Sequence, residues 1–163
     1  MKARIITIGD ELLIGQVIDT NSSWISSRLN ETGIKVAGRV SVADDAGDIK
    51  KALADALADA GCVVVTGGLG PTKDDITKTT LAEFFGCGMR EDKQVYEMVE
   101  RMLAARGIGF NALNRSQAMV PECCEVLPKP NGTAPGLWFE SGDKVVVSRP
   151  GVPLEMMGLM DSE

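Results

Sequence analysis

One stretch of the sequence constrains the fold more than any other, because an apolar run leads directly into a glycine-rich turn and then into acidic residues. The run covers residues 62–66, the turn covers residues 67–70, and Asp74 and Asp75 follow. A uniformly apolar strand is typical of a parallel sheet covered on both faces. Glycine lets the backbone approach a ligand, and the free N–H groups at a helix N-terminus favour an anion. The stretch predicts an α/β protein with a site for a phosphate ester, together with a cation that would offset the two carboxylates.

Length and charge narrow the class of protein. The chain has 163 residues and a formal net charge of −6 at pH 7. This length suits one well-buried core, so we expect a single domain over residues 1–163. The acidic balance argues against a general nucleic-acid binder and favours a small-molecule partner. No basic and apolar leader precedes Ala3, and no apolar run reaches the length of a membrane span, so we expect a soluble, cytoplasmic protein without a membrane partner.

The sequence contains no histidine and four cysteines. Without histidine, a serine–histidine triad and a histidine-ligated zinc site are excluded, and acid–base chemistry falls to carboxylates, lysine, tyrosine or water. The cysteines have neither the spacing of a metal site nor the density of a disulfide framework. We therefore expect free, partly buried thiols rather than a redox pair at Cys62, Cys87, Cys123 and Cys124.

The order of apolar patterns predicts a mainly parallel α/β sheet with antiparallel additions. The strand over residues 34–42 alternates apolar and polar side chains, which favours a place near a sheet edge. Helix signals include Thr20 or Asn21 as a cap and Gly33 as a terminator. Strands are expected over residues 4–8, 34–42, 62–66, 125–127, 137–140 and 144–148, with helices over 20–33, 44–60, 76–85, 92–106, 111–118 and 154–160.

Ligands of open α/β sheets bind beyond the carboxyl ends of the strands. Three unusual segments follow predicted strands in this way: residues 9–11, 67–75 and 149–153. A fourth, residues 130–136, is rich in glycine and proline, and its small residues would let the backbone touch a ring or a ribose. We predict that these segments share one edge of the sheet and form one site.

Each feature also has a structural interpretation. The glycine loop lacks the Lys-Ser or Lys-Thr of a P-loop, so it could be only a tight strand-to-helix turn. Asp74 could cap the next helix, and Asp75 could simply favour the helix dipole. Asp10 and Glu11 could be solvated turn acids, and residues 130–136 could be an ordinary loop. The residues alone leave these alternatives open.

Four motifs, taken in order, resemble the competence/damage-inducible protein A family. They are Gly9-Asp10-Glu11-Leu12-Leu13-x-Gly15 with Asp19-Thr20-Asn21, Gly67-Gly68-Leu69-Gly70-Pro71-Thr72-x-Asp74-Asp75-x-Thr77, Gly132-Thr133-Ala134-Pro135-Gly136, and Pro150-Gly151-Val152-Pro153-x-Glu155-Met156. The resemblance is to the N-terminal domain of that family, within the molybdopterin-binding superfamily, and it covers almost the whole chain. It implies a three-layer α/β/α domain, with a mainly parallel sheet and antiparallel hairpin additions, that associates as a homo-oligomer, either a dimer or a trimer. Many full-length members also carry a C-terminal amidohydrolase domain that acts on nicotinamide mononucleotide; we expect this domain to be absent and do not assign its activity to these 163 residues.

The resemblance also implies a reaction, the metal-dependent hydrolysis of ADP-ribose or a related nucleotide sugar to AMP and ribose 5-phosphate. A divalent ion, Mg²⁺, Mn²⁺ or Co²⁺, would neutralise the pyrophosphate and activate water, and carboxylates suffice to hold it. The implied catalytic and metal-binding acids are Asp75, Glu11 and Asp10. The implied substrate- and phosphate-binding residues are Asn21, Thr66, Gly67, Gly68, Gly70, Pro71, Thr72, Asp74, Thr77, Asn131, Gly132, Thr133, Ala134, Pro135, Gly136, Pro150 and Gly151.

Two other functions are compatible with the resemblance. One is the binding or adenylation of molybdopterin in molybdenum cofactor biosynthesis, with the pterin as the ligand. The other is a non-catalytic module that binds a nucleotide and oligomerises. The proline after the third glycine and the Gly-Asp-Glu-Leu-Leu opening favour hydrolysis. The sequence departs from the family pattern at Arg149, which replaces the usual leucine and either adds a phosphate contact or is exposed.

Overall fold

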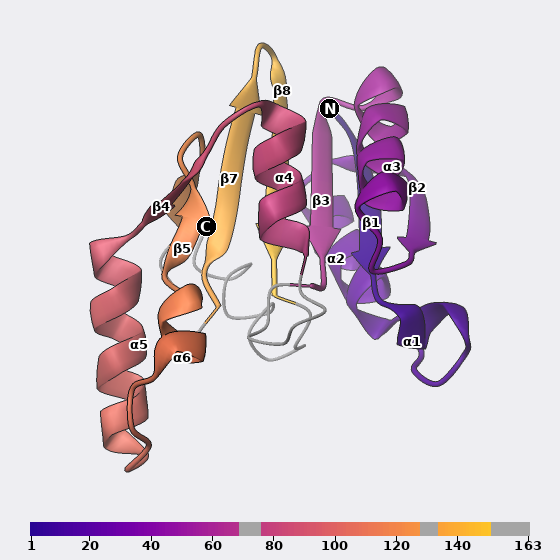
Figure 1. Ribbon diagram of the computed structural model, residues 1–163. Helices are drawn as coiled ribbons and strands as arrows, with labels where there is room; N and C mark the ends of the chain where they lie inside the picture. Colours follow the sequence, from indigo (N-terminus) through magenta and orange to yellow (C-terminus); the bar gives the residue numbers. More distant parts are fainter. Residues whose placement is uncertain (69–75, 128–133, 151–163) are drawn as a thin grey trace.

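The computed structural model describes residues 1–68, 76–127 and 134–150 (Figure 1). Its main sheet has six strands in the order β2-β1-β3-β8-β7-β6. The first four run parallel to one another, whereas β7 is antiparallel to both of its neighbours. The strands are β1 (Lys2–Ile8), β2 (Lys35–Val42), β3 (Cys62–Thr66), β6 (Glu125–Leu127), β7 (Gly136–Ser141) and β8 (Lys144–Arg149).

Helices cover both faces of this sheet and complete the three layers (Figure 1). One face packs against α2 (Thr20–Glu31), whose Ile25 and Leu29 meet Ile5 of β1 and Val64 of β3. The opposite face packs against α3 (Ala46–Asp59) and α4 (Thr77–Phe85), in a larger apolar cluster that includes Phe139. The predicted mainly parallel α/β fold with an antiparallel hairpin is confirmed, and β2 lies at the predicted sheet edge.

Capping residues fix where two of these helices begin. The Asp19 carboxylate accepts a hydrogen bond from the Ser22 N–H and caps α2, so the prediction that Thr20 or Asn21 caps this helix was wrong. Asp45 caps α3 through the Asp48 N–H, as its position at the predicted helix start indicated. A carboxylate at the N-cap satisfies a helix N–H group and complements the helix dipole.

A smaller lobe lies between α4 and β6 in the sequence. It contains a two-stranded antiparallel sheet of β4 (Met89–Glu91) and β5 (Met119–Pro121), with α5 (Lys93–Ala105) and α6 (Ala112–Ser116) between them. Neither strand was predicted from the sequence, because three residues are too few to show alternation. No helix in the described parts of the chain has the length and apolar character needed to cross a membrane.

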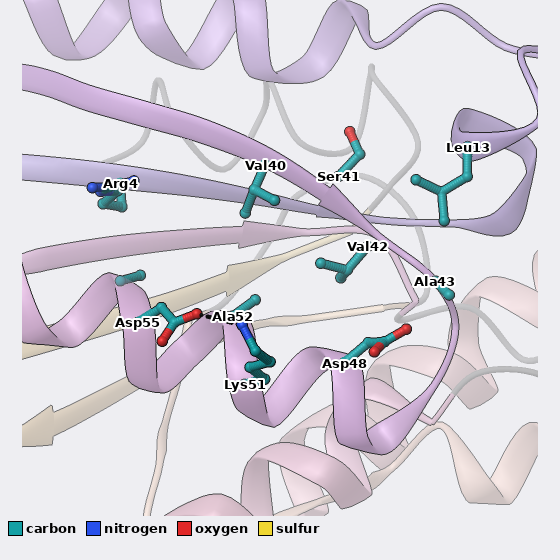
Figure 2. A pocket seen from close by; sticks show the side chains of 11 residues that line it. Arg4, Leu13, Val40, Ser41, Val42, Ala43, Asp48, Lys51, Ala52 and Asp55 are labelled. Atoms are coloured by element: carbon teal, nitrogen blue, oxygen red, sulfur yellow. Dashed lines mark hydrogen bonds and ion pairs between the residues drawn. The ribbon is translucent and has the colours of Figure 1, made fainter.

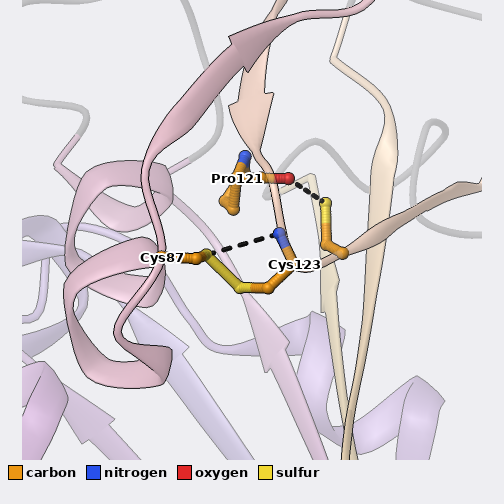
Figure 3. The surroundings of a disulfide bond; sticks show 4 residues. Cys87, Pro121 and Cys123 are labelled. Carbon is orange, nitrogen blue, oxygen red and sulfur yellow. Dashed lines mark hydrogen bonds between the residues drawn. A yellow bond between two sulfur atoms is a disulfide. The ribbon is translucent and has the colours of Figure 1, made fainter.

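A disulfide joins the two ends of this lobe (Figure 3). It links Cys87 and Cys123, whose Cα atoms are 5.9 Å apart, so the expectation of free thiols was wrong for this pair. Gly86 ends α4 in a left-handed conformation (φ +70°) immediately before Cys87, and Cys123 lies in the β5–β6 connection. Sequence spacing gives no sign of this turn's direction. The other two cysteines, Cys62 and Cys124, are free.

Candidate functional site

The predicted site segments meet where the parallel strands end. Because β1, β3 and β8 are adjacent and parallel, the residues after them share one edge of the sheet. The Gly67 N–H donates to the Arg149 carbonyl (3.3 Å), and the Thr66 hydroxyl donates to the Pro150 carbonyl (3.1 Å). The antiparallel β7 begins at the same edge with Gly136. The structure therefore brings together the described parts of all four segments.

Two glycines turn the chain after β3. Gly67 has φ +108° and Gly68 has φ +59°, both in the region that favours glycine. A Cβ on Gly67 would lie 2.2 Å from the Ile8 carbonyl oxygen, and a Cβ on Gly68 would lie 2.0 Å from Thr77 Oγ1. Both positions therefore require glycine for steric reasons as well as for conformation.

A cavity of about 320 Å³ opens between this glycine turn, α1 (Asp10–Leu13) and the start of α2. Its volume lies within the usual range of small-molecule sites, roughly 300–1,000 Å³. Its lining includes four polar side chains, which we call its polar side: Thr7, Asp19, Asn21 and Thr66. It also includes three aliphatic side chains, which we call its aliphatic side: Leu12, Val17 and Ile18. We call this space the edge cavity.

Hydrogen bonds connect the polar side of the edge cavity to three elements. Asp19 Oδ2 accepts from the hydroxyls of Thr7 (3.2 Å) and Ser22. Asn21 Nδ2 donates to Thr66 Oγ1 (3.3 Å), which links the start of α2 to the end of β3. Asp19 was not among the predicted site residues, although it occurs in one of the family motifs. The available signal was its position just before a helix, where an acid commonly caps.

The two acids that follow β1 have different surroundings. Asp10 is exposed, and its Oδ1 accepts from the Asp44 N–H (3.2 Å) while its own N–H donates to Asp44 Oδ2 (3.3 Å). These bonds tie α1 to the β2–α3 connection. Glu11 lines the edge cavity, and its carboxylate lies so close to Gly9 that a Cβ there would be 2.4 Å from Oε1. Of the two, only Glu11 therefore faces the cavity.

The start of α4 provides a second polar feature beside the glycine turn. The Thr77 side chain is fully buried, and its hydroxyl has no hydrogen-bond partner in the described structure. The N-cap position of α4 is Ile76, and none of the described side chains caps this helix. A helix start beside a buried hydroxyl has donors that an anion requires.

Arg149 is buried, with 5% of its surface exposed, so the alternative that it is exposed was wrong. Its side chain is on the α2 side of β8, where it lines a cavity with Cys62 and Trp138. Burial raises the pKa of the Cys62 thiol, and the positive charge of Arg149 partly offsets this effect.

The remaining predicted residues divide into two sets. Ala134, Pro135 and Gly136 are buried where β7 begins. The others lie outside the described residues, and their predicted roles stay predictions: Gly70, Pro71, Thr72, Asp74, Asp75, Asn131, Gly132, Thr133 and Gly151.

The described carboxylates offer a limited set of metal ligands. In residues 1–68, 76–127 and 134–150, no group of three or more acidic or cysteine side chains is arranged to hold a metal ion. Among the described residues, the carboxylates that line the edge cavity are those of Glu11 and Asp19. Asp19 is already engaged by three donors, so Glu11 is the described side chain best placed to bind a cation.

Another cavity, of about 380 Å³, lies between α3 and the sheet edge (Figure 2). Val40 of β2 and Leu13 of α1 line it, together with Asp48, Lys51 and Asp55 of α3. None of the predicted site residues that the structure describes lines this cavity, so it is separate from the edge cavity.

The fold and the edge cavity define a class of protein, a three-layer α/β domain with a cavity at the carboxyl edge of a mainly parallel sheet. The family model described as a probable molybdopterin binding domain matches residues 4–163. The crystal structure of the protein CinA from Thermoplasma acidophilum, titled as having unknown function, superposes with a TM-score of 0.90. That similarity has 35% sequence identity and covers 99% of this chain and 94% of the other. The chain therefore belongs to the probable molybdopterin binding domain family, and to the CinA-like proteins within it.

Two further comparisons set the scope of this assignment. A CinA-like protein of Cytophaga hutchinsonii is 48% identical over 158 residues, which cover 97% of this chain and 38% of the relative. The chain thus spans about two fifths of that relative's length. The tungsten cofactor synthesizing protein MoaB of Pyrococcus furiosus has 20% identity and a TM-score of 0.64, over 99% of this chain and 88% of the other. This last likeness supports the fold alone.

Proposed function

We propose that the edge cavity binds a phosphate ester and that the domain hydrolyses the pyrophosphate of ADP-ribose or a related nucleotide sugar. Water adds to one phosphorus, the bond from that phosphorus to the bridging oxygen breaks, and two phosphate monoesters, AMP and ribose 5-phosphate, leave with release of a proton. The observation that carries the proposal is the Gly67–Gly68 turn against the buried Thr77 hydroxyl, with the starts of α2 and α4 beside it.

The phosphate part of the proposal rests on how this turn is built. Side chains are excluded at both glycines, so the backbone of the turn can approach a bound oxygen closely, although the Gly67 N–H itself already donates to the Arg149 carbonyl. The N-terminus of α4 adds partial positive charge, and the Thr77 hydroxyl can donate to the same anion. A phosphate there would give this buried hydroxyl the partner it otherwise lacks.

The metal part rests on the donor chemistry. A divalent ion would neutralise the pyrophosphate and lower the pKa of a bound water. Glu11 supplies a carboxylate at the cavity, and Asp75 is proposed as the second acid because it follows the glycine turn in the sequence. Oxygen ligands of this kind suit Mg²⁺, Mn²⁺ or Co²⁺. Asp10 would then act by holding α1, and with it Glu11, in place.

The test is AMP release from ADP-ribose with and without added divalent metal. We expect metal-dependent release that the variants Glu11→Gln and Asp75→Asn lose, since each change removes a negative charge and keeps the shape. The exposed residues Glu100 and Asp143 provide matched controls, and Glu100→Gln and Asp143→Asn should keep full activity. Absence of AMP release by folded protein with every metal would refute hydrolysis and favour a binding module without turnover.

Pterin binding is the second candidate function, and the description of the family model favours it. The phosphate of a pterin would occupy the same glycine turn, so the two functions differ in the ring and in turnover. Retention of molybdopterin by the purified domain, followed by pterin fluorescence, together with no hydrolysis of ADP-ribose, would support this candidate over the first.

A further inference from the structure

The segment between β1 and α2 exposes four large aliphatic side chains. Leu13 is 52% exposed, Ile14 67%, Val17 52% and Ile18 83%. Single exposed aliphatic residues are common on protein surfaces, but two adjacent ones that line a cavity indicate that something apolar binds there. Val17 and Ile18 line the edge cavity, whereas Ile14 does not.

Backbone hydrogen bonds hold this aliphatic side in a defined position. The N–H groups of Gln16 and Val17 both donate to the Glu11 carbonyl, at 3.0 and 3.2 Å. The Thr20 N–H donates to the Ile18 carbonyl at 2.8 Å, immediately before α2 begins. Val17 and Ile18 are therefore presented to the cavity by the fold, between a carboxylate-bearing helix and the polar start of α2.

We propose that Val17 and Ile18 form a wall against which a flat heteroaromatic ring of the ligand packs, while its phosphate lies at the glycine turn. This inference rests on the proposed phosphate site and adds the part of the ligand that the site selects. A purine or a pterin has apolar faces and hydrogen-bonding edges. Its face would cover the aliphatic wall, and its edge would meet the polar side of the cavity.

Other ligand chemistries fit this cavity less well. A lipid chain would bury Thr7, Asp19 and Thr66 against hydrocarbon, which costs free energy because their polar groups would lose access to water. A sugar phosphate without a base would leave the aliphatic wall exposed and gain nothing from it. The combination of one aliphatic and one polar side therefore points to a ring attached to a phosphate.

The two products of the proposed reaction are the probes, because AMP carries the ring and ribose 5-phosphate does not. We expect wild-type protein to bind AMP more tightly than ribose 5-phosphate in equilibrium titrations. Ile18→Ala and Val17→Ala should each weaken AMP binding by about threefold to tenfold, as expected for losing part of one buried aliphatic side chain. Neither change should alter the binding of ribose 5-phosphate. Ile14→Ala is the matched control, since this side chain is exposed in the same segment but does not line the cavity.

Several results would refute the proposal that Val17 and Ile18 pack against a ring of the ligand. Equal binding of AMP and ribose 5-phosphate by the wild type would do so while leaving the phosphate site in place. Binding of neither compound would refute the phosphate site as well. If Ile14→Ala and Ile18→Ala instead change the oligomeric state in size-exclusion chromatography and leave AMP binding unaltered, the aliphatic segment is a contact between copies of the chain.

Discussion

Substitution of Gly68 by alanine tests the steric basis of the glycine turn. Two costs add in this variant. A left-handed φ costs an L-residue about 1–2 kcal/mol. The new Cβ would lie 2.0 Å from Thr77 Oγ1, and overpacking of this kind costs typically about 1–3 kcal/mol. We expect Gly68→Ala to lower the free energy of unfolding by roughly 2–5 kcal/mol, measured by urea denaturation.

A control and a double-mutant cycle separate the two costs. Gly142 has φ +64° and open space around its Cβ position, so Gly142→Ala should show the conformational cost alone. Thr77→Ala removes the clashing oxygen and should recover the overpacking part of the loss in the Gly68→Ala background. Thr77→Val keeps an atom at that place and should not. The reasoning is refuted if Gly68→Ala costs no more than Gly142→Ala, or if Thr77→Ala gives no recovery.

Three further predictions concern the stability of the fold. Reducing the Cys87–Cys123 disulfide opens the loop that this bond closes, which raises the conformational entropy of the unfolded chain. The free energy of unfolding should therefore fall by roughly 2–4 kcal/mol on reduction, and the Cys87→Ser/Cys123→Ser variant should no longer respond to reductant in urea denaturation. Burial raises the pKa of Asp92, but hydrogen bonds to its carboxylate outweigh burial, so the net pKa is lowered in the folded protein. The stability that the Asp92 carboxylate adds is therefore present above the ordinary carboxyl pKa and is lost as pH falls through the pKa of Asp92 in the folded state. The gap in thermal midpoint between wild type and Asp92→Asn should therefore shrink from pH 7 to pH 3, and a constant gap would contradict this account. Asp19→Ala should cost about 1–2 kcal/mol by removing the α2 cap, whereas Asp19→Asn should cost less because asparagine also caps; equal losses in thermal or urea unfolding would contradict the capping role.

The sequence predicts the elements with strong local patterns and misses those set by distant contacts. The strand Cys62–Thr66 has the predicted bounds, because its apolar run ends at glycine on both sides. The edge position of β2 also followed from its alternating side chains. The strands β4 and β5 were missed because each is three residues long and is defined by its partner.

The candidate site shows the same division. The meeting of the segments that follow β1, β3 and β8 was predictable, because parallel strands end at a common edge. That Glu11 lines the edge cavity and Asp10 does not was not predictable from the sequence, since Asp10 contacts Asp44, which lies in the β2–α3 connection far along the chain. The place of Asp19 beneath the edge cavity depends likewise on the Thr7 hydroxyl.

The disulfide has a consequence for how this fold can vary. It joins residues 36 positions apart, and the whole lobe of β4, α5, α6 and β5 lies between them. The two ends of that lobe are therefore side by side, which is the arrangement that allows a segment to be inserted, exchanged or shortened without moving the chain around it. The main sheet and its edge cavity come from the chain on either side. Because Val120 of β5 packs in the core of the main sheet, the part free to vary is the α5–α6 region, in which evolution or design can change length and surface while the six-stranded sheet keeps its register.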